Sequence, residues 1–534
     1  MQWGALKTGV LGMFYPHPEK LDEIEFSGDI NNYVSAHKYR VYAPDEKLLD
    51  LIVNSLVPKK NRFKIGNLRS TECRMLLPEK SLPNVPIQIS TEDFMGTRTA
   101  LFGKTRLGKS NVVKKIAESL IKTTEETKNI GQIIFDINGE YANDNPQDGS
   151  KSLRSLYEER CVVYALVPKE STPSDPLKLN FYEYPAKSLP VIASFLRQDN
   201  RNAAYVRSFS SVELTPIEEI ANFSDSGERI RAIRRIQIFW AILKKAGFPV
   251  NESTLLSKAP SHSRTRGFNP NFSRALRSAA YGESNVPNQL NTLDLLVREL
   301  EIIAQFQRTN PNHNTLTTGS GNPLFNSDDI ALLDFLAPQS GRAGTIFLRP
   351  YRIYHDKDAG NYKREVLGYI DKGKTVILDL GHANPVLLKY FSDELSKAVF
   401  NYQVMKFAGD KLGDHFIQLY FEEAHNLFPH DQGEMRIYSQ LAKEGAKYNI
   451  GLIYSTQSPT SINKDLLFQT ENFFVLHLSS KEQVDALGRL NVAYESLKQE
   501  ILSAKSVGFM RMLTRSHRFV VSVQALKFSP NAGE

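Results

Sequence analysis

The chain has 534 residues, of which 41% are hydrophobic and 23% are charged, and these ordinary globular proportions exclude wholesale disorder. The length suggests about three or four folding units, and the formal net charge of +7 permits a nucleic-acid partner without requiring one. Two cysteines without CxxC spacing exclude a disulfide framework and a cysteine-based zinc finger, and no apolar stretch reaches the ~18 residues of a membrane helix. With no evident signal peptide, the expected location is cytoplasmic.

Residues 1–95 alternate short apolar runs with Pro, Gly, Asn and Asp, a pattern typical of a small β-rich module. One helical stretch is expected at Asp45–Leu56. The apolar runs that predict strands are Gly9–Phe14, Tyr39–Tyr42, Cys73–Leu77 and Val85–Ile89.

From Arg98 onward, predicted strands alternate with predicted helices, which indicates βαβ units and a mainly parallel sheet in an α/β core. Helices are expected at Asn111–Thr124, Tyr390–Lys406 and Gly433–Tyr448. The buried strands are expected at Arg98–Phe102, Gln132–Phe135, Val162–Leu166, Thr375–Leu380, Phe416–Phe421, Ile450–Ser455 and Phe473–Leu478.

A helical and polar region, roughly Tyr182–Ile370, separates the two halves of this core and is predicted to be an insertion. Within it, Gln307–Asp329 is rich in Asn, Gly and Pro and is expected to form a flexible surface loop. The predicted domains are a β module (1–95), a core (96–185 and 371–525), a helical insertion (186–370) and a C-terminal tail (526–534).

The strongest chemical signal is Gly103-Lys104-Thr105-Arg106-Leu107-Gly108-Lys109-Ser110, which fits G-x-x-x-x-G-K-[ST] between a predicted strand and an amphipathic helix. Such a loop turns its N–H groups inward, and the helix that follows directs its positive end at phosphate. Lys109 would bridge the β- and γ-phosphates and the Ser110 hydroxyl would coordinate Mg²⁺, so ATP and Mg²⁺ are the expected cofactors. The predicted phosphate-binding residues are Gly103, Lys104, Thr105, Gly108, Lys109, Ser110 and Asn111.

A predicted strand, Phe416–Phe421, runs directly into two carboxylates, Glu422 and Glu423. Glu422 is expected to hold Mg²⁺, and Glu423 is expected to polarise the attacking water. A charged helix start is the alternative, because acidic residues favour helix N-termini. Together with the P-loop, the catalytic interpretation is preferred.

Two more strand ends are expected at the same edge of the sheet, where α/β folds build their sites. Asp136 and Glu140 follow one strand as auxiliary strand-end residues. Gln457 follows another and is predicted to sense the γ-phosphate or to position water.

These motifs together resemble the HerA-type P-loop ATPases of the HerA/FtsK group, over about residues 95–180 and 370–525. The resemblance implies a RecA-like core, an N-terminal β-barrel module, a homohexameric ring with ATP at its subunit interfaces, and translocation on duplex DNA. It also implies an effector partner, such as a nuclease or a sirtuin-type NADase, and a role in anti-phage defence. The segments that carry it are the P-loop, Asp136–Tyr141, Glu422–Asn426, Glu444–Tyr448 and Ser455–Pro459.

Two positions depart from the pattern of that family. Glu422 stands where Asp is more common, and its longer side chain is still expected to reach Mg²⁺ through water. Ala446 stands where relatives commonly have Arg, so Arg436 or Lys447 on the same predicted helix are the candidates for a trans-acting charge. The alternative function is therefore an ATP-ordered hexameric scaffold that assembles and activates an effector with little or no translocation.

The basic excess of the chain is local. Arg229–Arg277 holds eleven basic residues and one acid, Glu252, a sum of +10, so the remaining chain sums to 7 − 10 = −3. An amphipathic basic helix and an exposed basic loop at His262–Phe272 are expected, and they favour contact with DNA phosphates. A solvated face over a packed helix, or a dock for an acidic protein, is the alternative. The predicted contact residues are Arg231, Arg234, Arg235, Arg264 and Arg266.

Overall fold

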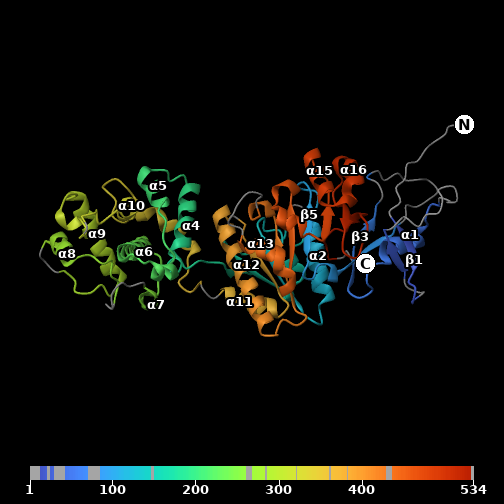
Figure 1. Ribbon diagram of the computed structural model, residues 1–534, viewed down its shortest axis with the longest axis horizontal. Coiled ribbons are helices and arrows are strands. Elements are labelled where there is room, and N and C mark those ends of the chain that lie inside the picture. Colours follow the sequence, from blue (N-terminus) through green and yellow to red (C-terminus); the bar gives the residue numbers. More distant parts are fainter. Residues whose placement is uncertain are drawn as a thin grey trace. The chain divides into compact units, whose positions relative to one another are not determined.

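The computed structural model describes residues 12–20, 24–28, 42–69, 72, 84–145, 150–259, 267–282, 286–319, 321–359, 362–381, 383–428 and 436–530. The chain divides into two compact units, which are described separately (Figure 1). The first unit comprises Met1–Asp175, Arg364–His382 and Phe391–Glu534. The second unit comprises Pro176–Lys363 and Ala383–Tyr390.

The first unit is built on a sheet that, in the described residues, has twelve strands in the order β4-β3-β14-β13-β12-β5-β11-β10-β6-β9-β7-β8. Its centre is parallel, as predicted, and each strand expected from Arg98 onward overlaps an observed one. The parallel strands are β5 Arg98–Phe102, β6 Ile130–Asp136, β7 Cys161–Ala165, β9 Thr375–Asp379, β10 Phe416–Phe421, β11 Ile450–Thr456 and β12 Asn472–Val475. The remaining strands are β3 Arg62–Leu68, β4 Pro86–Ser90, β13 Phe509–Leu513 and β14 Val521–Ala525, which pair antiparallel, and β8 Asp175–Pro176 at the far edge.

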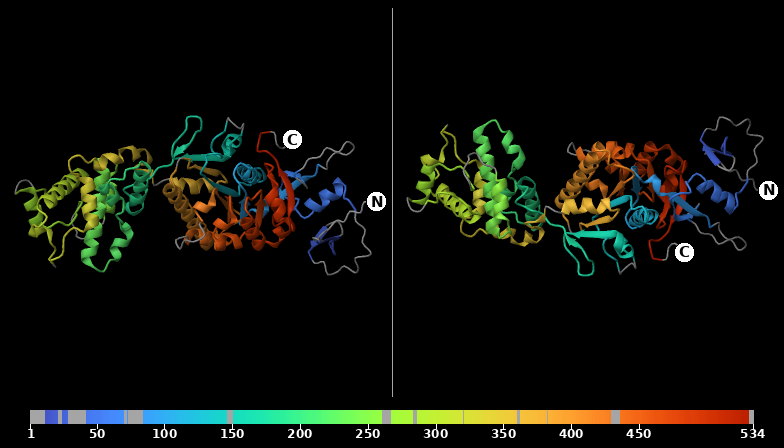
Figure 2. Two further views of the ribbon diagram at one scale, coloured as in Figure 1. Left: turned by 90° about the horizontal axis from the view of Figure 1, so that it is seen from above. Right: turned by 90° about the horizontal axis from the view of Figure 1, so that it is seen from below.

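Helices cover both faces of this sheet (Figure 2). Helix α2 (Lys109–Thr123) joins β5 to β6 across one face, and α13 (Arg436–Glu444) joins β10 to β11 across the other, because right-handed crossovers in opposite directions lie on opposite faces. The apolar side of α2, with Val112 and Ile116 fully buried, packs on the sheet core. The other helices around the sheet are α3 Leu153–Leu156, α11 Tyr362–Asp371, α12 Pro385–Ala408, α14 Lys464–Phe468, α15 Lys481–Leu490 and α16 Lys498–Ser503.

The predicted N-terminal β-barrel is not found among the described residues. The hairpin β1 (Met13–Pro16) and β2 (Ile24–Ser27) forms a separate two-stranded sheet, and helix α1 (Glu46–Asn54) follows it. Strands β3 and β4 instead extend the central sheet, because the free edge of β14 pairs with β3. Two of the predicted apolar runs, Tyr39–Tyr42 and Cys73–Leu77, lie almost wholly outside the described residues.

The second unit is helical, as predicted. Helix α6 lies at its centre with Trp240 fully buried, and the indole N–H donates to the Tyr182 carbonyl at 3.0 Å. Between α9 and α10 the predicted loop contains one short turn of helix, η5 (Asn314–Leu316). The helices are α4 Pro185–Gln198, α5 Ala204–Ser210, α6 Ser226–Ala246, α7 Glu252–Lys258, α8 Arg274–Tyr281, α9 Leu293–Thr309, α10 Ser327–Leu336 and the 3₁₀ helix η6 Gly344–Tyr354.

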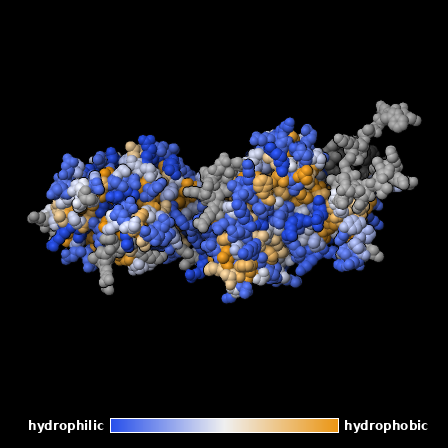
Figure 3. All heavy atoms as spheres, in the orientation of Figure 1, coloured by the Kyte–Doolittle hydropathy of each residue, from blue (hydrophilic) through white to orange (hydrophobic). Residues whose placement is uncertain are grey.

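In the described part of the chain, no helix combines the length and the apolar character that crossing a bilayer requires. Hydrophilic side chains cover most of the face shown in Figure 3, with small apolar patches between them.

Candidate nucleotide-binding site

The carboxyl ends of the parallel strands lie level at one edge of the central sheet. Strand pairing places Phe102 of β5 opposite Thr456 of β11, and Phe421 of β10 opposite Phe135 of β6. The segments that follow these strands are the four in which sequence motifs were found. The sheet register therefore brings the predicted site residues of the P-loop, β6, β10 and β11 to a common edge.

The P-loop has the backbone that phosphate binding requires. Gly108 caps α2 with φ 95° and ψ 21°, a left-handed conformation that favours glycine. A Cβ at Gly103 would lie 2.8 Å from the Cβ of Leu476, so only glycine fits beside β12. Both glycines of the motif are thus required by the fold as well as by the space a phosphate needs.

Lys109 is the first residue of α2, and its side chain is buried against the loop. Its Nζ donates to the Gly103 carbonyl at 2.6 Å. Burial lowers the pKa of Lys109, and the nearby carboxylates of Glu423, Glu422 and Glu140 counteract that shift. The ammonium group is therefore held between the loop and the acidic strand ends.

Glu422 is a buried carboxylate, only 4% exposed. Its Oε1 accepts a hydrogen bond from the Tyr141 hydroxyl at 2.9 Å, and its Oε2 accepts one from the Asn138 amide at 3.4 Å. Burial raises the pKa of Glu422 well above its usual range, the charges of Asp136 and Glu140 raise it further, and hydrogen bonds from Tyr141 and Ser110 oppose the rise. A cation at this position would relieve the cost of ionising a buried acid.

The donor set at this edge fits Mg²⁺ bound together with a nucleotide. The Ser110 hydroxyl and the Glu422 carboxylate are hard oxygen ligands, and Ser110 is close enough to Glu422 to lower the pKa of that carboxyl group. Within the described ranges, no group of three or more His, Cys, Asp or Glu side chains is arranged to hold a metal by itself. Mg²⁺ usually takes one or two protein ligands and completes its shell with phosphate and water, which matches this arrangement.

Glu423 has an unusual backbone conformation. Its φ of 42° and ψ of 49° lie in the left-handed region, which costs a non-glycine residue about 1–2 kcal/mol. Its Oε1 accepts a 3.5 Å hydrogen bond from the Gln457 amide, and its Oε2 lies 3.4 Å from Nδ1 of His425. That Oε2 is buried and makes no hydrogen bond within the described structure. An acceptor oxygen is therefore available between two polar side chains, as a general base requires.

His425 was not among the predicted site residues. Its ring lies 3.4 Å from the hydroxyl of Thr456 as well as from Glu423, so it joins the ends of β10 and β11. Its position three residues after Glu422, within the segment Glu422–Asn426, was the only indication in the sequence that it belongs to the site. Its contact with Glu423 could not be predicted, because that contact depends on the left-handed turn at Glu423.

Asp136 organises its own turn. It is fully buried and accepts backbone hydrogen bonds from Glu140, Tyr141 and Ala142 at 2.9–3.0 Å. Burial raises its pKa, and the adjacent Asp379 raises it further. Asp136 thus fixes the turn that presents Tyr141 to Glu422, while the Glu140 side chain is exposed. Asp379, at the end of β9, is a further strand-end carboxylate, and it was not among the predicted site residues.

Other predicted residues have different surroundings. The Asn111 amide donates to the Leu526 carbonyl and accepts from the Phe528 N–H, both at 2.8 Å, so its side chain holds the C-terminal segment. Lys447 lies in η9 (Gly445–Tyr448), which precedes β11 and therefore lies at the opposite edge of the sheet, about 20 Å from its carboxyl ends. Its ammonium group lies over the ring of Phe407 at 5.0 Å. Arg436 begins α13.

The predicted basic patch on α6 is largely occupied by contacts within the second unit. Arg234 is 3% exposed and donates to the carbonyls of Pro270 and Leu324, both at 3.0 Å. Arg235 forms ion pairs with Asp328 at 3.2 Å and with Asp329 at 3.0 Å. These two guanidinium groups support the packed-helix alternative. Arg231 is partly exposed, and Arg264 and Arg266 lie outside the described residues.

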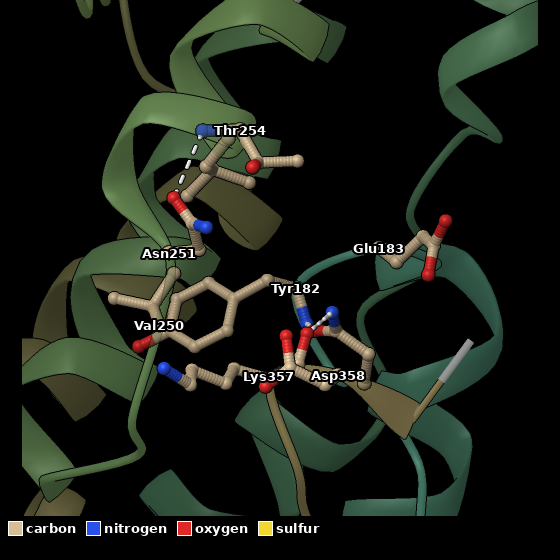
Figure 4. Close-up of a pocket in the computed structure, with 9 residues that line it drawn as sticks. Tyr182, Glu183, Val250, Asn251, Thr254, Lys357 and Asp358 are labelled. Atoms are coloured by element: carbon tan, nitrogen blue, oxygen red, sulfur yellow. Dashed lines mark hydrogen bonds between the residues drawn. The ribbon is translucent and has the colours of Figure 1, made fainter. Parts of the chain in front are cut away.

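A small cavity in the second unit has a volume of about 110 Å³ (Figure 4). Tyr182, Val250 and Lys357 are among its lining residues, and Asn251 beside it accepts a hydrogen bond from the Thr254 N–H at 3.2 Å. Ligand sites usually have volumes of about 300–1,000 Å³, so this cavity is too small for a nucleotide. None of the predicted site residues lines it.

Residues 63–224 match the family model of the helicase HerA central domain (DUF87). The HerA match contains β3, the P-loop and the Asp136 turn and covers less than a third of the chain. Glu422 and Glu423 lie beyond it, so their assignment depends on the strand pairing of β10 with β6. No curated protein matches the chain.

Several solved structures are similar to this chain at low identity. VirB4 of Thermoanaerobacter pseudethanolicus matches at 14% identity over 90% of this chain and 100% of its own, with a TM-score of 0.40. The bacterial conjugative coupling protein TrwB matches at 12% identity over 89% and 96%, with a TM-score of 0.40, and TrwB is also known in complex with ADP and Mg²⁺. The genome packaging NTPase B204 of Sulfolobus turreted icosahedral virus 2, in complex with AMP, matches at 12% identity over 29% and 68%, with a TM-score of 0.23.

Proposed function

We propose that this chain is a Mg²⁺-dependent ATPase of the HerA type that assembles as a homohexameric ring and translocates on duplex DNA. The observation that carries the ATPase is the meeting, at one sheet edge, of the P-loop lysine, a buried hydrogen-bonded carboxylate and a second carboxylate with an available oxygen. The match of residues 63–224 to the HerA central domain supports the choice of family.

Each residue of the site has its own role in the proposed hydrolysis of ATP. The loop N–H groups and Lys109 hold the phosphates, and Ser110 with Glu422 holds Mg²⁺. Bound Mg²⁺–ATP supplies the phosphoryl group and neutralises the charge that develops on it. Glu423 accepts the proton of the attacking water at its Oε2, and Gln457 orients the water or the γ-phosphate. The Tyr141 hydroxyl favours the ionised form of Glu422 by donating to it.

The test is ATP hydrolysis by the purified full-length chain. Lys109→Ala is expected to abolish nucleotide binding, whereas Glu423→Gln is expected to retain binding and to lose turnover by at least about 10²-fold. Lys122→Ala, at an exposed position of the same helix, is the matched control. Unchanged hydrolysis in both site variants would defeat the assignment. DNA-stimulated turnover that falls steeply with salt would support translocation.

One observation favours a second candidate, an ATP-ordered scaffold that activates an effector such as a nuclease or a sirtuin-type NADase. Ala446 carries no charge, and the Lys447 ammonium group lies over two aromatic rings rather than projecting freely. A weak trans-acting charge would slow hydrolysis without preventing binding. Under this alternative, Glu423→Gln would still assemble with the effector and support its activity. The effector and the anti-phage role stay predictions from the resemblance, and the cytoplasmic location stays a prediction from the sequence.

A further inference from the structure

The 3₁₀ helix η6 of the second unit exposes an unusual combination of arginine and isoleucine. It spans eleven residues, whereas 3₁₀ helices longer than three or four residues are uncommon. With three residues per turn, Ile346, Arg349 and Arg352 lie along one line of this helix, and all three are exposed. Ile346 and Ile353 are 53% and 59% exposed and are the large hydrophobic residues most exposed in the described part of this unit.

Two more exposed arginines are held beside η6 by aromatic rings. The guanidinium of Arg201 lies 4.7 Å from the ring centre of Phe347, and that of Arg342 lies 5.2 Å from that of Tyr205. The arginine face is therefore defined by Arg201, Arg342, Arg349 and Arg352, together with the two isoleucines. Among the residues that the structure describes, none of these four arginines forms an ion pair.

The hydrogen bond from the Tyr351 hydroxyl to Asp199, at 2.7 Å, joins η6 to the end of α4. Stacking of Phe195 on Tyr354, with ring centres 4.6 Å apart, secures the same junction. These two contacts anchor η6, which carries Arg349 and Arg352, to the end of α4, and an anchored surface loses less conformational freedom when a partner binds.

The same unit exposes an acidic segment, residues 212–228, which contains no Lys or Arg. Five acids on it are exposed, and in the described part of the structure none forms an ion pair: Glu213, Glu218, Glu219, Asp225 and Glu228. Asp225 caps α6 through the Gly227 N–H, which fixes one end of the segment. In the described part of the unit, the charged side chains of the arginine face and of the acidic segment are therefore exposed and form no salt bridges.

We propose that the arginine face of one copy docks on the acidic segment of a second copy of this chain. The complementary charge identifies the partner, and the exposed isoleucines favour protein over nucleic acid, because a phosphate backbone offers them nothing to contact. Arginine with aromatic and apolar residues is the composition of protein interfaces. Because the two surfaces differ, the contact is head-to-tail, which closes into a ring when the rotation allows. The proposal rests on the ring of the proposed function and assigns one of its contacts.

Charge reversal in the full-length chain tests this pairing. The variant Arg349→Glu with Arg352→Glu and the variant Glu218→Arg with Glu219→Arg are each expected to raise the concentration for assembly by about tenfold, measured by native mass at low salt. Mixing the two variants, or combining all four substitutions in one chain, is expected to restore assembly. Arg274→Glu, at an exposed arginine of α8 outside both surfaces, is the matched control.

Binding of a fluorescent ATP analogue and of duplex DNA is measured on the same samples. Loss of assembly with unchanged nucleotide binding and recovery on mixing supports the pairing, even if the chain hydrolyses no ATP. Unchanged mass in both variants, or loss without recovery on mixing, overturns it. Weaker DNA binding with unchanged mass also overturns it and assigns the arginine face to nucleic acid.

Discussion

Removing the Tyr141 hydroxyl should change how the site uses Mg²⁺ while leaving the fold in place. In Tyr141→Phe, Glu422 loses the 2.9 Å hydrogen bond that opposes its raised pKa. Hydrogen bonds to charged groups contribute about 1.5–3 kcal/mol, so a loss of about 2 kcal/mol corresponds to a roughly thirtyfold weaker preference for the ionised carboxylate. Protons should then compete better with Mg²⁺, and half-maximal turnover should need more Mg²⁺.

The assay measures ATP hydrolysis as a function of Mg²⁺ concentration, at about pH 7 and again at about pH 8.5. The defect of Tyr141→Phe should shrink at the higher pH, because a carboxyl group with a raised pKa ionises as pH rises. Tyr420→Phe is the matched control, since that hydroxyl is equally buried and donates to Gln132 within the same sheet. Both variants should lose similar thermal stability. An unchanged Mg²⁺ and pH dependence in Tyr141→Phe, relative to the control, would refute the role given to Glu422.

Three further variants test single features. Gly103→Ala places a Cβ 2.8 Å from that of Leu476, so overpacking by about 1–3 kcal/mol should displace the loop and weaken ATP binding at least about tenfold, measured by titration. Arg234→Met should destabilise the chain by about 1–3 kcal/mol in thermal melts, since two carbonyls lose their donor, without changing the salt slope of DNA binding. Burial lowers the pKa of His517 to about 4, so the folded chain should lose up to about 3 kcal/mol of stability as the pH falls from 6.5 toward 4. The variant His517→Gln should show a smaller loss over this pH range in thermal melts. The same loss in the variant and in the unaltered chain would contradict this role of His517.

The sequence predicted the parallel core well because its signals are local. Buried parallel strands are near-continuous apolar runs, and a strand such as Phe416–Phe421 is read directly from them. The rule that active sites form at the carboxyl ends of parallel strands then places Glu422 near Lys109 without any knowledge of the sheet order. That rule does not give the order of the strands, and the structure shows that β10 lies between β6 and β11.

The sequence predicted less well where distant segments decide the outcome. The +10 sum over Arg229–Arg277 is offset in the structure by acids from elsewhere, since Arg235 pairs with Asp328 and Asp329, and Arg277 pairs with Glu299 at 2.5 Å. Summing charge along the chain cannot detect such partners. The N-terminal β-barrel was likewise expected from resemblance, whereas β3 pairs with β4 on one side and, on the other, with β14, a strand more than 400 residues later.

The backbone conformation of Glu423 is local, yet the sequence did not predict it. A left-handed conformation at a glutamate is destabilising, and no sequence pattern predicts it. It occurs in a short turn, because β10 ends two residues earlier, at Phe421, and η8 (Ala424–Asn426) begins at the next residue. The turn places successive carboxylates in different surroundings: Glu422 is buried among donors, whereas Glu423 keeps one oxygen without a hydrogen bond. Two adjacent glutamates thereby acquire the different surroundings that the proposed roles of metal ligand and base require.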